Sequence, residues 1–226
     1  MLKIPLAEIL RPNNIDDYIG QKHLVGKNAI LRKSLESGNI HSMILWGPPG
    51  VGKTTLAYII SNFINADFHT LSAINSGVKD VRNIIENAKN AKKKSILFID
   101  EIHRFSKSQQ DSLLGAVEKG IITLIGATTE NPSFEVISPL LSRCQIYILK
   151  NLDIEEIMII AEKAIKFLEQ EIKKKIVIAE NEALIRISGG DARKLLNAIE
   201  IIVFSLIDNE EIIITNKNAI ENIQQN

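Results

Sequence analysis

The chain has 226 residues, enough for one large domain or for a medium-sized domain with a small companion. Apolar residues make up 45% of it and charged residues 24%, which is typical of soluble globular proteins rather than disordered, collagenous or membrane chains. Lys plus Arg and Asp plus Glu number 27 each, so no overall basic excess indicates a nucleic-acid partner, and any such contact has to come from a local patch.

Several features bear on the compartment. Cys144 is the only cysteine and has no partner for an internal disulfide, which suits a reducing environment. The first residues place Glu8 inside a very short apolar run, unlike a signal peptide. No segment reaches the ~18 uninterrupted apolar residues of a membrane span. We therefore expect a cytoplasmic protein.

Along the first two thirds of the chain, short apolar strands alternate with helical patterns. The predicted strands are residues 42–46, 67–71, 95–99, 121–127 and 144–149. The predicted helices between them are residues 53–64, 78–91, 108–118 and 139–142. This alternation predicts an α/β fold with a parallel sheet flanked by helices on both faces.

From residue 153 onward the strand signal nearly vanishes. Apolar positions recur at helical spacing over residues 153–172, 181–187, 191–207 and 216–223. The joint falls near residues 150–152. We therefore predict an α/β domain at residues 1–150 and a small all-α domain at residues 151–226.

A phosphate-binding loop follows the first predicted strand and precedes a helix. It comprises Gly47, Pro48, Pro49, Gly50, Val51, Gly52, Lys53 and Thr54, and we include Thr55 in the site. Glycines let backbone amides turn toward a β-phosphate, and the helix N-terminus adds positive potential. Lys53 is expected to reach the β- and γ-phosphate oxygens, and Thr54 to offer a hydroxyl to Mg²⁺. The pattern predicts ATP as ligand.

Two acids end the third predicted strand. The apolar run of residues 96–99 indicates a buried strand that delivers Asp100 and Glu101 to the same sheet edge as the phosphate loop. Asp100 is expected to hold the Mg²⁺ shell, and Glu101 to orient the attacking water. The second acid favours ATP hydrolysis over binding alone.

The fourth strand breaks into a polar turn at residues 128–132. A side chain there could bind the γ-phosphate or the water; Thr128 is our first choice, and Thr129 and Asn131 remain alternatives. Arg143 and Arg193 each lie beside a helix boundary, and a guanidinium suits a transferring phosphoryl group. From the residues alone, each arginine is also compatible with an ordinary surface or salt-bridging role.

Together these motifs resemble those of the AAA+ ATPases. Their amino-acid sequences are similar to those of the RarA family, also called MgsA, which is related to eukaryotic Werner-helicase-interacting ATPases. The resemblance runs from about Leu6 to at least Asn197. It is carried by residues 11–12, 18–21, 41–50, 76–79, 100–105, 107–111 and 126–134.

The resemblance implies roles that spacing alone does not. Thr128 corresponds to sensor 1, Arg143 to the arginine finger that reaches a neighbouring subunit's γ-phosphate, and Arg193 to sensor 2 in the helical lid. The segment that packs the adenine corresponds to Arg11, Pro12, Ile19 and Gly20. A finger supplied by a neighbour couples turnover to homo-oligomerisation.

The resemblance also implies action on DNA forks, gaps or ends, with single-strand-binding protein and replisome components as partners. Lys79 and Arg82 are candidates for DNA phosphate contact, although they also fit ordinary helix-surface charges. Family members continue beyond the lid into a helical region that builds the tetramer, whereas this chain stops at Asn226, so we expect weakened assembly. The alternatives are a clamp-loader-like subunit, a branch-migration motor, or an ATP-binding interaction module with little turnover.

Overall fold

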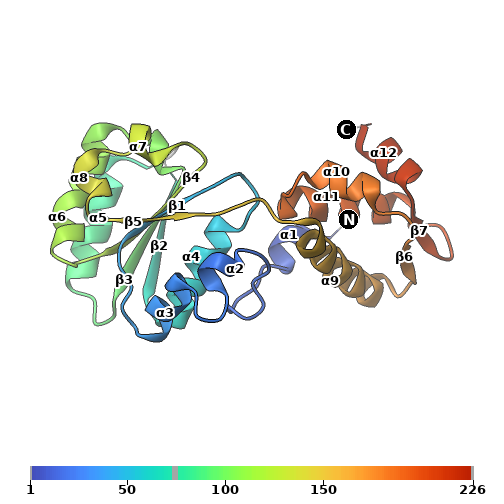
Figure 1. Cartoon of the computed structure of the whole chain (residues 1–226), viewed down its shortest axis with the longest axis horizontal. Helices are drawn as coiled ribbons and strands as arrows, with labels where there is room; N and C mark the ends of the chain where they lie inside the picture. The colour runs from blue at the N-terminus through green and yellow to red at the C-terminus, as the bar shows by residue number, and fades with distance from the viewer. Residues whose placement is uncertain (1, 73–75, 225–226) are drawn as a thin grey trace. The chain divides into compact units, whose positions relative to one another are not determined.

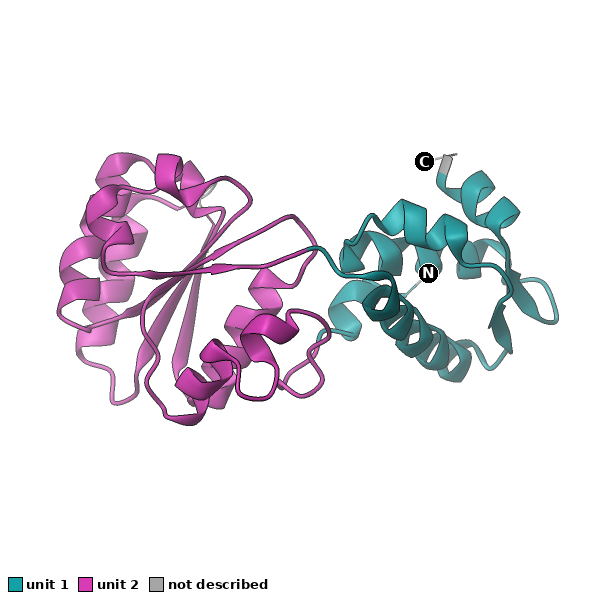
Figure 2. Ribbon diagram, viewed as in Figure 1, with its two compact units in different colours: residues 1–11, 151–226 teal, residues 12–150 magenta. Residues whose placement is uncertain are grey.

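The computed structural model of the chain describes residues 2–72 and 76–224. The chain divides into two compact units, residues 12–150 and residues 1–11 with 151–226 (Figure 2). The second unit resumes within the predicted joint, but it also takes in residues 1–11, which the sequence assigned to the α/β domain. Helix α1 (Leu6–Ile9) explains this difference, because Leu6 is fully buried in the core of the second unit and its N–H donates to Glu200 Oε2 at 2.9 Å.

The larger unit contains a parallel sheet with the strand order β2-β3-β4-β1-β5 (Figure 1). Its strands are β1 (Met43–Trp46), β2 (Asp67–Ser72), β3 (Ser95–Asp100), β4 (Thr123–Thr128) and β5 (Gln145–Ile148). Each strand lies within two residues of its predicted bounds. The predicted α/β fold is confirmed.

Helices cover both faces of this sheet, as the near-continuous apolar strands require. They are α2 (Lys22–Val25), α3 (Ile30–Glu36), α4 (Lys53–Phe63), α5 (Val78–Lys89), α6 (Lys107–Glu118), α7 (Pro132–Glu135), α8 (Ser138–Leu141) and the 3₁₀ helix η1 (Ile102–Arg104). Alternate strand residues enter different cores: Met43 and Leu45 pack with α3 and α4, whereas Ile44 packs with α5, α6 and α8. Helices α2, α3, α7 and η1 were not predicted, because such short helices show little periodicity.

The second unit consists mainly of α1, α9 (Ile154–Ile172), α10 (Glu182–Ser188), α11 (Ala192–Ser205) and α12 (Asn216–Gln224). The prediction that this domain is all helical is wrong in one respect. Strand β6 (Ile176–Ile178) pairs in parallel with β7 (Ile212–Ile214). Both are runs of β-branched residues, which favour strands, but three residues are too few to show alternation.

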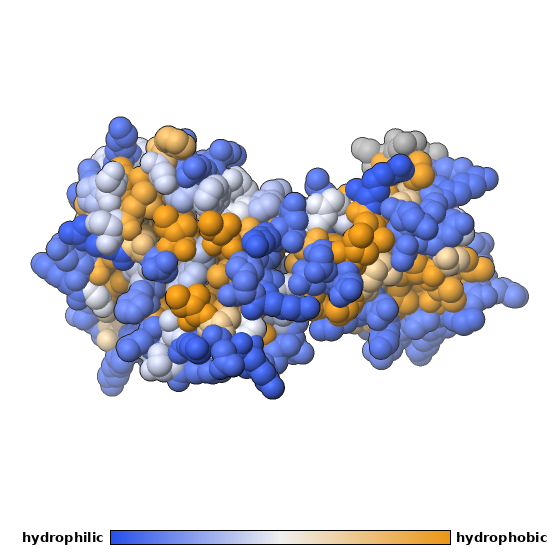
Figure 3. Space-filling model, in the orientation of Figure 1, coloured by the Kyte–Doolittle hydropathy of each residue, from blue (hydrophilic) through white to orange (hydrophobic). Residues whose placement is uncertain are grey.

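The surface is mixed in character: Figure 3 shows polar residues over much of the visible face of each unit, with apolar patches among them. Exposed apolar side chains of the larger unit include Phe134, which is 84% exposed, and Ile30 and Ile148. Within the described ranges, no helix is both long enough and apolar enough to cross a membrane.

Candidate active site

The phosphate loop occupies residues 47–52, between the carboxyl end of β1 and the start of α4. Gly50 and Gly52 take positive φ angles of 68° and 95°, which a glycine adopts without steric cost. Gly47 has no room for a side chain, because a Cβ there would overlap the carbonyl oxygen of Leu149. The glycine positions are therefore required by backbone shape.

Lys53 begins α4 and is almost fully buried. Its Nζ donates to the carbonyl oxygens of Gly47 at 2.7 Å and Pro48 at 2.8 Å, so the ammonium lies over the loop that precedes it. A buried ammonium is stable only with such acceptors. Phosphate oxygens entering the loop offer acceptors of opposite charge, to which this ammonium can bond.

The loop is supported by Tyr18, a buried residue for which the sequence suggested no separate role. Its hydroxyl lies 3.2 Å from the carbonyl oxygen of Val51 and 3.3 Å from that of Gly52. In a trans peptide the C=O and the following N–H point in opposite directions. Carbonyls directed toward Tyr18 therefore direct the N–H groups of Gly52 and Lys53 to the opposite side.

The two acidic residues at the end of β3, Asp100 and Glu101, differ in backbone conformation and in contacts. Asp100 ends the strand opposite Ser72 and is partly exposed. Glu101 has left-handed backbone angles (φ 53°, ψ 50°), a conformation that is uncommon for a non-glycine residue and that turns the chain sharply into η1. Glu101 Oε2 lies 3.1 Å from Nδ1 of His103 and makes a longer contact of 3.5 Å with the hydroxyl of Thr129.

The three sensor-1 candidates lie in different environments, and among these described residues only Thr129 contacts the Glu101 carboxylate. Thr128 is fully buried, and its hydroxyl contacts His103 Nδ1 at 3.0 Å and both backbone groups of Glu130, at 3.0 and 3.2 Å. Thr129 is partly exposed. The side-chain oxygen of Asn131 accepts the N–H of Ser133 at 3.0 Å and thus caps α7.

Arg143 lies at the amino ends of the parallel strands, whereas the phosphate loop lies at their carboxyl ends. The parallel register pairs Met43 with Gln145 and Trp46 with Ile148, so residue 143 precedes the amino end of β5 while Gly47 follows the carboxyl end of β1. Four residues of strand span roughly 13 Å. Arg143 donates to Pro139 O at 2.7 Å and to Glu118 Oε1 at 3.2 Å.

The remaining predicted residues are distributed over both units. Pro12, Ile19 and Gly20 belong to the larger unit, and Gly20 is buried with a φ of 91°. Arg11 is in the second unit, where it pairs with Glu8 at 2.5 Å. Arg193 is also in the second unit, exposed on the first turn of α11.

Gln21 is a second structural residue that the sequence did not indicate. Its buried amide donates to Lys150 O at 2.6 Å and accepts from Lys150 N at 2.9 Å. These paired bonds hold the chain at the end of β5, where the larger unit ends. Gln21 is buried and has a positive φ of 54°, but neither property can be read from the sequence.

A metal ion would need ligands from the nucleotide. Among residues 2–72 and 76–224, no three His, Cys, Asp or Glu side chains gather into a metal site. Mg²⁺ is commonly bound by one or two protein oxygens together with substrate phosphates. Thr54, on the first turn of α4, and Asp100, at the end of β3, offer a hydroxyl and a carboxylate of this kind.

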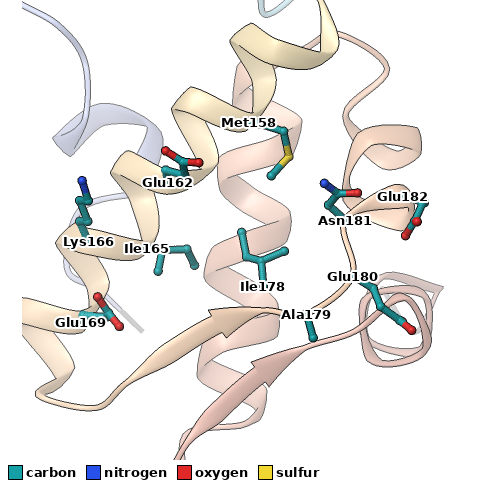
Figure 4. A pocket seen from close by; sticks show the side chains of 10 residues that line it. All are labelled: Met158, Glu162, Ile165, Lys166, Glu169, Ile178, Ala179, Glu180, Asn181 and Glu182. Atoms are coloured by element: carbon teal, nitrogen blue, oxygen red, sulfur yellow. The ribbon is translucent and has the colours of Figure 1, made fainter.

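The second unit contains a separate hollow of about 460 Å³ beside α9, β6 and the start of α10 (Figure 4). Met158 and Ile178 line it together with Glu162, Lys166 and Glu169. Glu169 accepts the N–H of Ile176 at 2.9 Å and so fastens β6 to α9. The excess of carboxylates disfavours a phosphate ligand here.

Comparison with known proteins decides the family. Residues 10–138 match the model of the Holliday junction DNA helicase RuvB P-loop domain. The chain belongs to this RuvB-type P-loop family. A solved structure titled Thermotoga maritima RuvB Holliday junction branch migration motor shares 28% identity at a TM-score of 0.77, covering 96% of this chain and 72% of that one.

Similar proteins in the same comparison confirm the predicted resemblance to the RarA family. Replication-associated recombination protein A of Haemophilus influenzae is 47% identical over 205 residues, covering 88% of this chain and 46% of the relative. The corresponding protein of Escherichia coli (strain K12) is 48% identical over 202 residues, covering 87% and 45%. ATPase WRNIP1 of Dictyostelium discoideum is 43% identical over 204 residues, covering 88% and 23%. The chain thus spans about half the length of the RarA relatives it matches, and its fold is that of an AAA+ P-loop nucleotide-binding protein.

Proposed function

We propose that this chain is a DNA-dependent ATPase of the RarA type that acts in replication-fork maintenance and recombination, with ATP hydrolysed between neighbouring copies. The supporting observation is the placement of Arg143 at the sheet edge opposite Gly47, Glu101 and Thr129. An arginine there does not serve the same chain's nucleotide. It is suited to a nucleotide held by the next subunit.

Each residue of the site has a separate role in the proposed reaction. The backbone N–H groups of residues 50–53 and the Lys53 ammonium bind the phosphates, and Glu101 orients the water in line with the γ-phosphorus. Arg143 of a neighbour stabilises the charge that spreads over the transferring group. Mg²⁺ held by Thr54 and Asp100 supplies further neutralisation of the phosphates when bound.

We revise one assignment of the proposed site and keep the others. Thr129 is better suited than Thr128 to contact the γ-phosphate or the water, because the Thr128 hydroxyl is fully buried among other partners. Thr55, Pro12, Ile19, Gly20 and Arg11 stay proposed nucleotide contacts, Arg193 a proposed sensor 2, and Lys79 and Arg82, exposed on α5, proposed DNA contacts. We also propose a cytoplasmic location, supported by the single cysteine and by the bacterial relatives.

Mixing two inactive variants tests the shared site. Lys53→Ala removes the phosphate-binding cation and Arg143→Ala removes the finger, so each alone should lose DNA-stimulated ATP turnover. In the mixture, an intact phosphate loop faces an intact arginine at some interfaces, and turnover should return. Arg186→Ala, at an exposed position of α10 (Glu182–Ser188) that has no proposed role, serves as the arginine control. Assembly of the mixture, verified by mass, without any recovered turnover would contradict a shared site.

A branch-migration motor is the second candidate, favoured by the RuvB P-loop match and the shared fold. The two functions differ in the DNA that stimulates them. ATP turnover should be measured with gapped or forked duplexes and with four-way junctions of equal length. Stimulation confined to four-way junctions would favour the second candidate.

A further inference from the structure

We propose that His103 is a positioning residue for Glu101, holding one carboxylate oxygen so that the other faces the attacking water. This inference rests on the proposed role of Glu101 in ATP hydrolysis. The observation that carries it is a contact between the ends of two neighbouring strands: His103 Nδ1 lies 3.1 Å from Glu101 Oε2 and 3.0 Å from Thr128 Oγ1.

The hydrogen bonds around Thr128 indicate which ring nitrogen carries a proton. The Thr128 hydroxyl has one proton, and it faces the carbonyl oxygen of Glu130 at 3.2 Å while its oxygen accepts the N–H of the same residue at 3.0 Å. A proton on His103 Nδ1 then has two acceptors, Thr128 Oγ1 and Glu101 Oε2. A bare Nδ1 would instead set a lone pair against the carboxylate.

The 3₁₀ turn that carries His103 is held in place by buried residues before and after it in the sequence. Ile102 and Phe105 are buried in the core, and the side chain of Ile102 packs so closely on Gly126 that a Cβ there would overlap it. Within η1, Arg104 N donates to Glu101 O at 2.8 Å. The imidazole is therefore held in one place, which is what a group that orients another side chain requires.

Glu101 Oε2 is thereby occupied by His103 and approached by Thr129 at 3.5 Å. A freely rotating carboxylate would spend much of its time pointing away from the water, whereas one held at a single oxygen keeps the second oxygen in a defined direction. His103 thus acts through Glu101 and need not touch the nucleotide.

Steady-state kinetics on the full chain with DNA tests this role. His103→Ala should lower kcat on the order of ten- to a hundredfold, the effect of losing one hydrogen bond to a charged group. KM for ATP should change less than about twofold, because ground-state binding is untouched. His103→Asn places a donor near the position of Nδ1 and should recover most of kcat, whereas His103→Gln places its donor farther out and should not.

The partly buried His69 of β2 supplies the control, as His69→Asn should leave kcat and KM unchanged. Equal loss in the Ala and Asn variants, a parallel rise in KM, or an unchanged kcat in His103→Ala would overturn the proposal.

A measurement without turnover separates this proposal from the proposed function. The chain has four histidines, so their ring nitrogens can be assigned by single substitutions in long-range ¹H–¹⁵N NMR spectra. We expect a protonated Nδ1 on His103, with a resonance that shifts more in Glu101→Gln than those of the other three imidazoles. A bare Nδ1, or no shift, would overturn the positioning role even if the chain hydrolyses ATP. A chain with this spectrum but without turnover would instead contradict the proposed function alone.

Discussion

The hydroxyl of Tyr18 lies 3.2 Å from the carbonyl oxygen of Val51, which ties the segment before α2 to the phosphate loop. Gly52 is part of the same contact, since a Cβ on it would overlap the tyrosine hydroxyl. Tyr18 and the loop thus fit each other closely. The loop's carbonyls are held on one side and its amides are left for a ligand on the other.

Tyr18→Phe should weaken nucleotide binding while the fold is kept. It removes only the hydroxyl that orients the loop, and a hydrogen bond of this kind contributes about 0.5–1.5 kcal/mol, or roughly a two- to tenfold loss of affinity. Titration calorimetry with an ATP analogue measures the change. Tyr58→Phe, which retains the ring beside Phe68, is the matched control. Equal affinities of Tyr18→Phe and the unsubstituted chain would contradict this role for the hydroxyl.

The neighbouring threonines should respond differently to removal of the hydroxyl. Thr128→Val is expected to lower the free energy of unfolding by about 1–3 kcal/mol, because the buried Thr128 hydroxyl makes two hydrogen bonds to the backbone of Glu130 and both are lost. Thr129→Val should leave stability nearly unchanged and lower kcat, since Thr129 is partly exposed beside Glu101. Urea unfolding and ATPase kinetics on both variants measure these effects. The reverse pattern would restore Thr128 as the sensor.

Two glycines of the larger unit should show opposite effects on stability when replaced by alanine. Gly47→Ala forces a Cβ against the carbonyl oxygen of Leu149 and should destabilise the fold by about 1–3 kcal/mol. Gly115, exposed inside α6, has open space at its Cβ position, so Gly115→Ala should stabilise by about 0.5–1 kcal/mol. Thermal unfolding monitored by circular dichroism tests both. A stable Gly47→Ala chain that binds nucleotide normally would show that the strand and loop can separate.

The thiol of Cys144 should resist alkylation. Burial raises its pKa to about 11 from an ordinary value of 9.0, so at pH 8 its thiolate is about a hundredfold scarcer than in the unfolded chain. Because the unfolded thiol loses its proton first, this group should make the free energy of unfolding fall as pH rises from 9 to 11. Iodoacetamide labelling at pH 8, with and without urea, measures the difference. Equal labelling rates would show that the thiol is accessible in the folded chain.

Local sequence determined the sheet strands and the phosphate loop. Strands β1 and β3 are almost continuous apolar runs, and residues 47–54 carry in one short stretch both the glycines and the cation that a phosphate needs. These features depend on neighbours along the chain, so periodicity and spacing reveal them. The same is true of Asp100 and Glu101, which the apolar run of β3 delivers to a sheet edge.

Only the tertiary structure decided which side chains meet. The pleat that buries Thr128 and leaves Thr129 partly exposed depends on how β4 lies between β3 and β1. Three contacts join segments far apart in sequence: that of His103 with Thr128, that of Tyr18 with the phosphate loop, and that of α1 with Glu200 in the second unit. So does the register that sets Arg143 at the edge opposite Gly47. Such relationships depend on packing and strand order, which no single segment encodes.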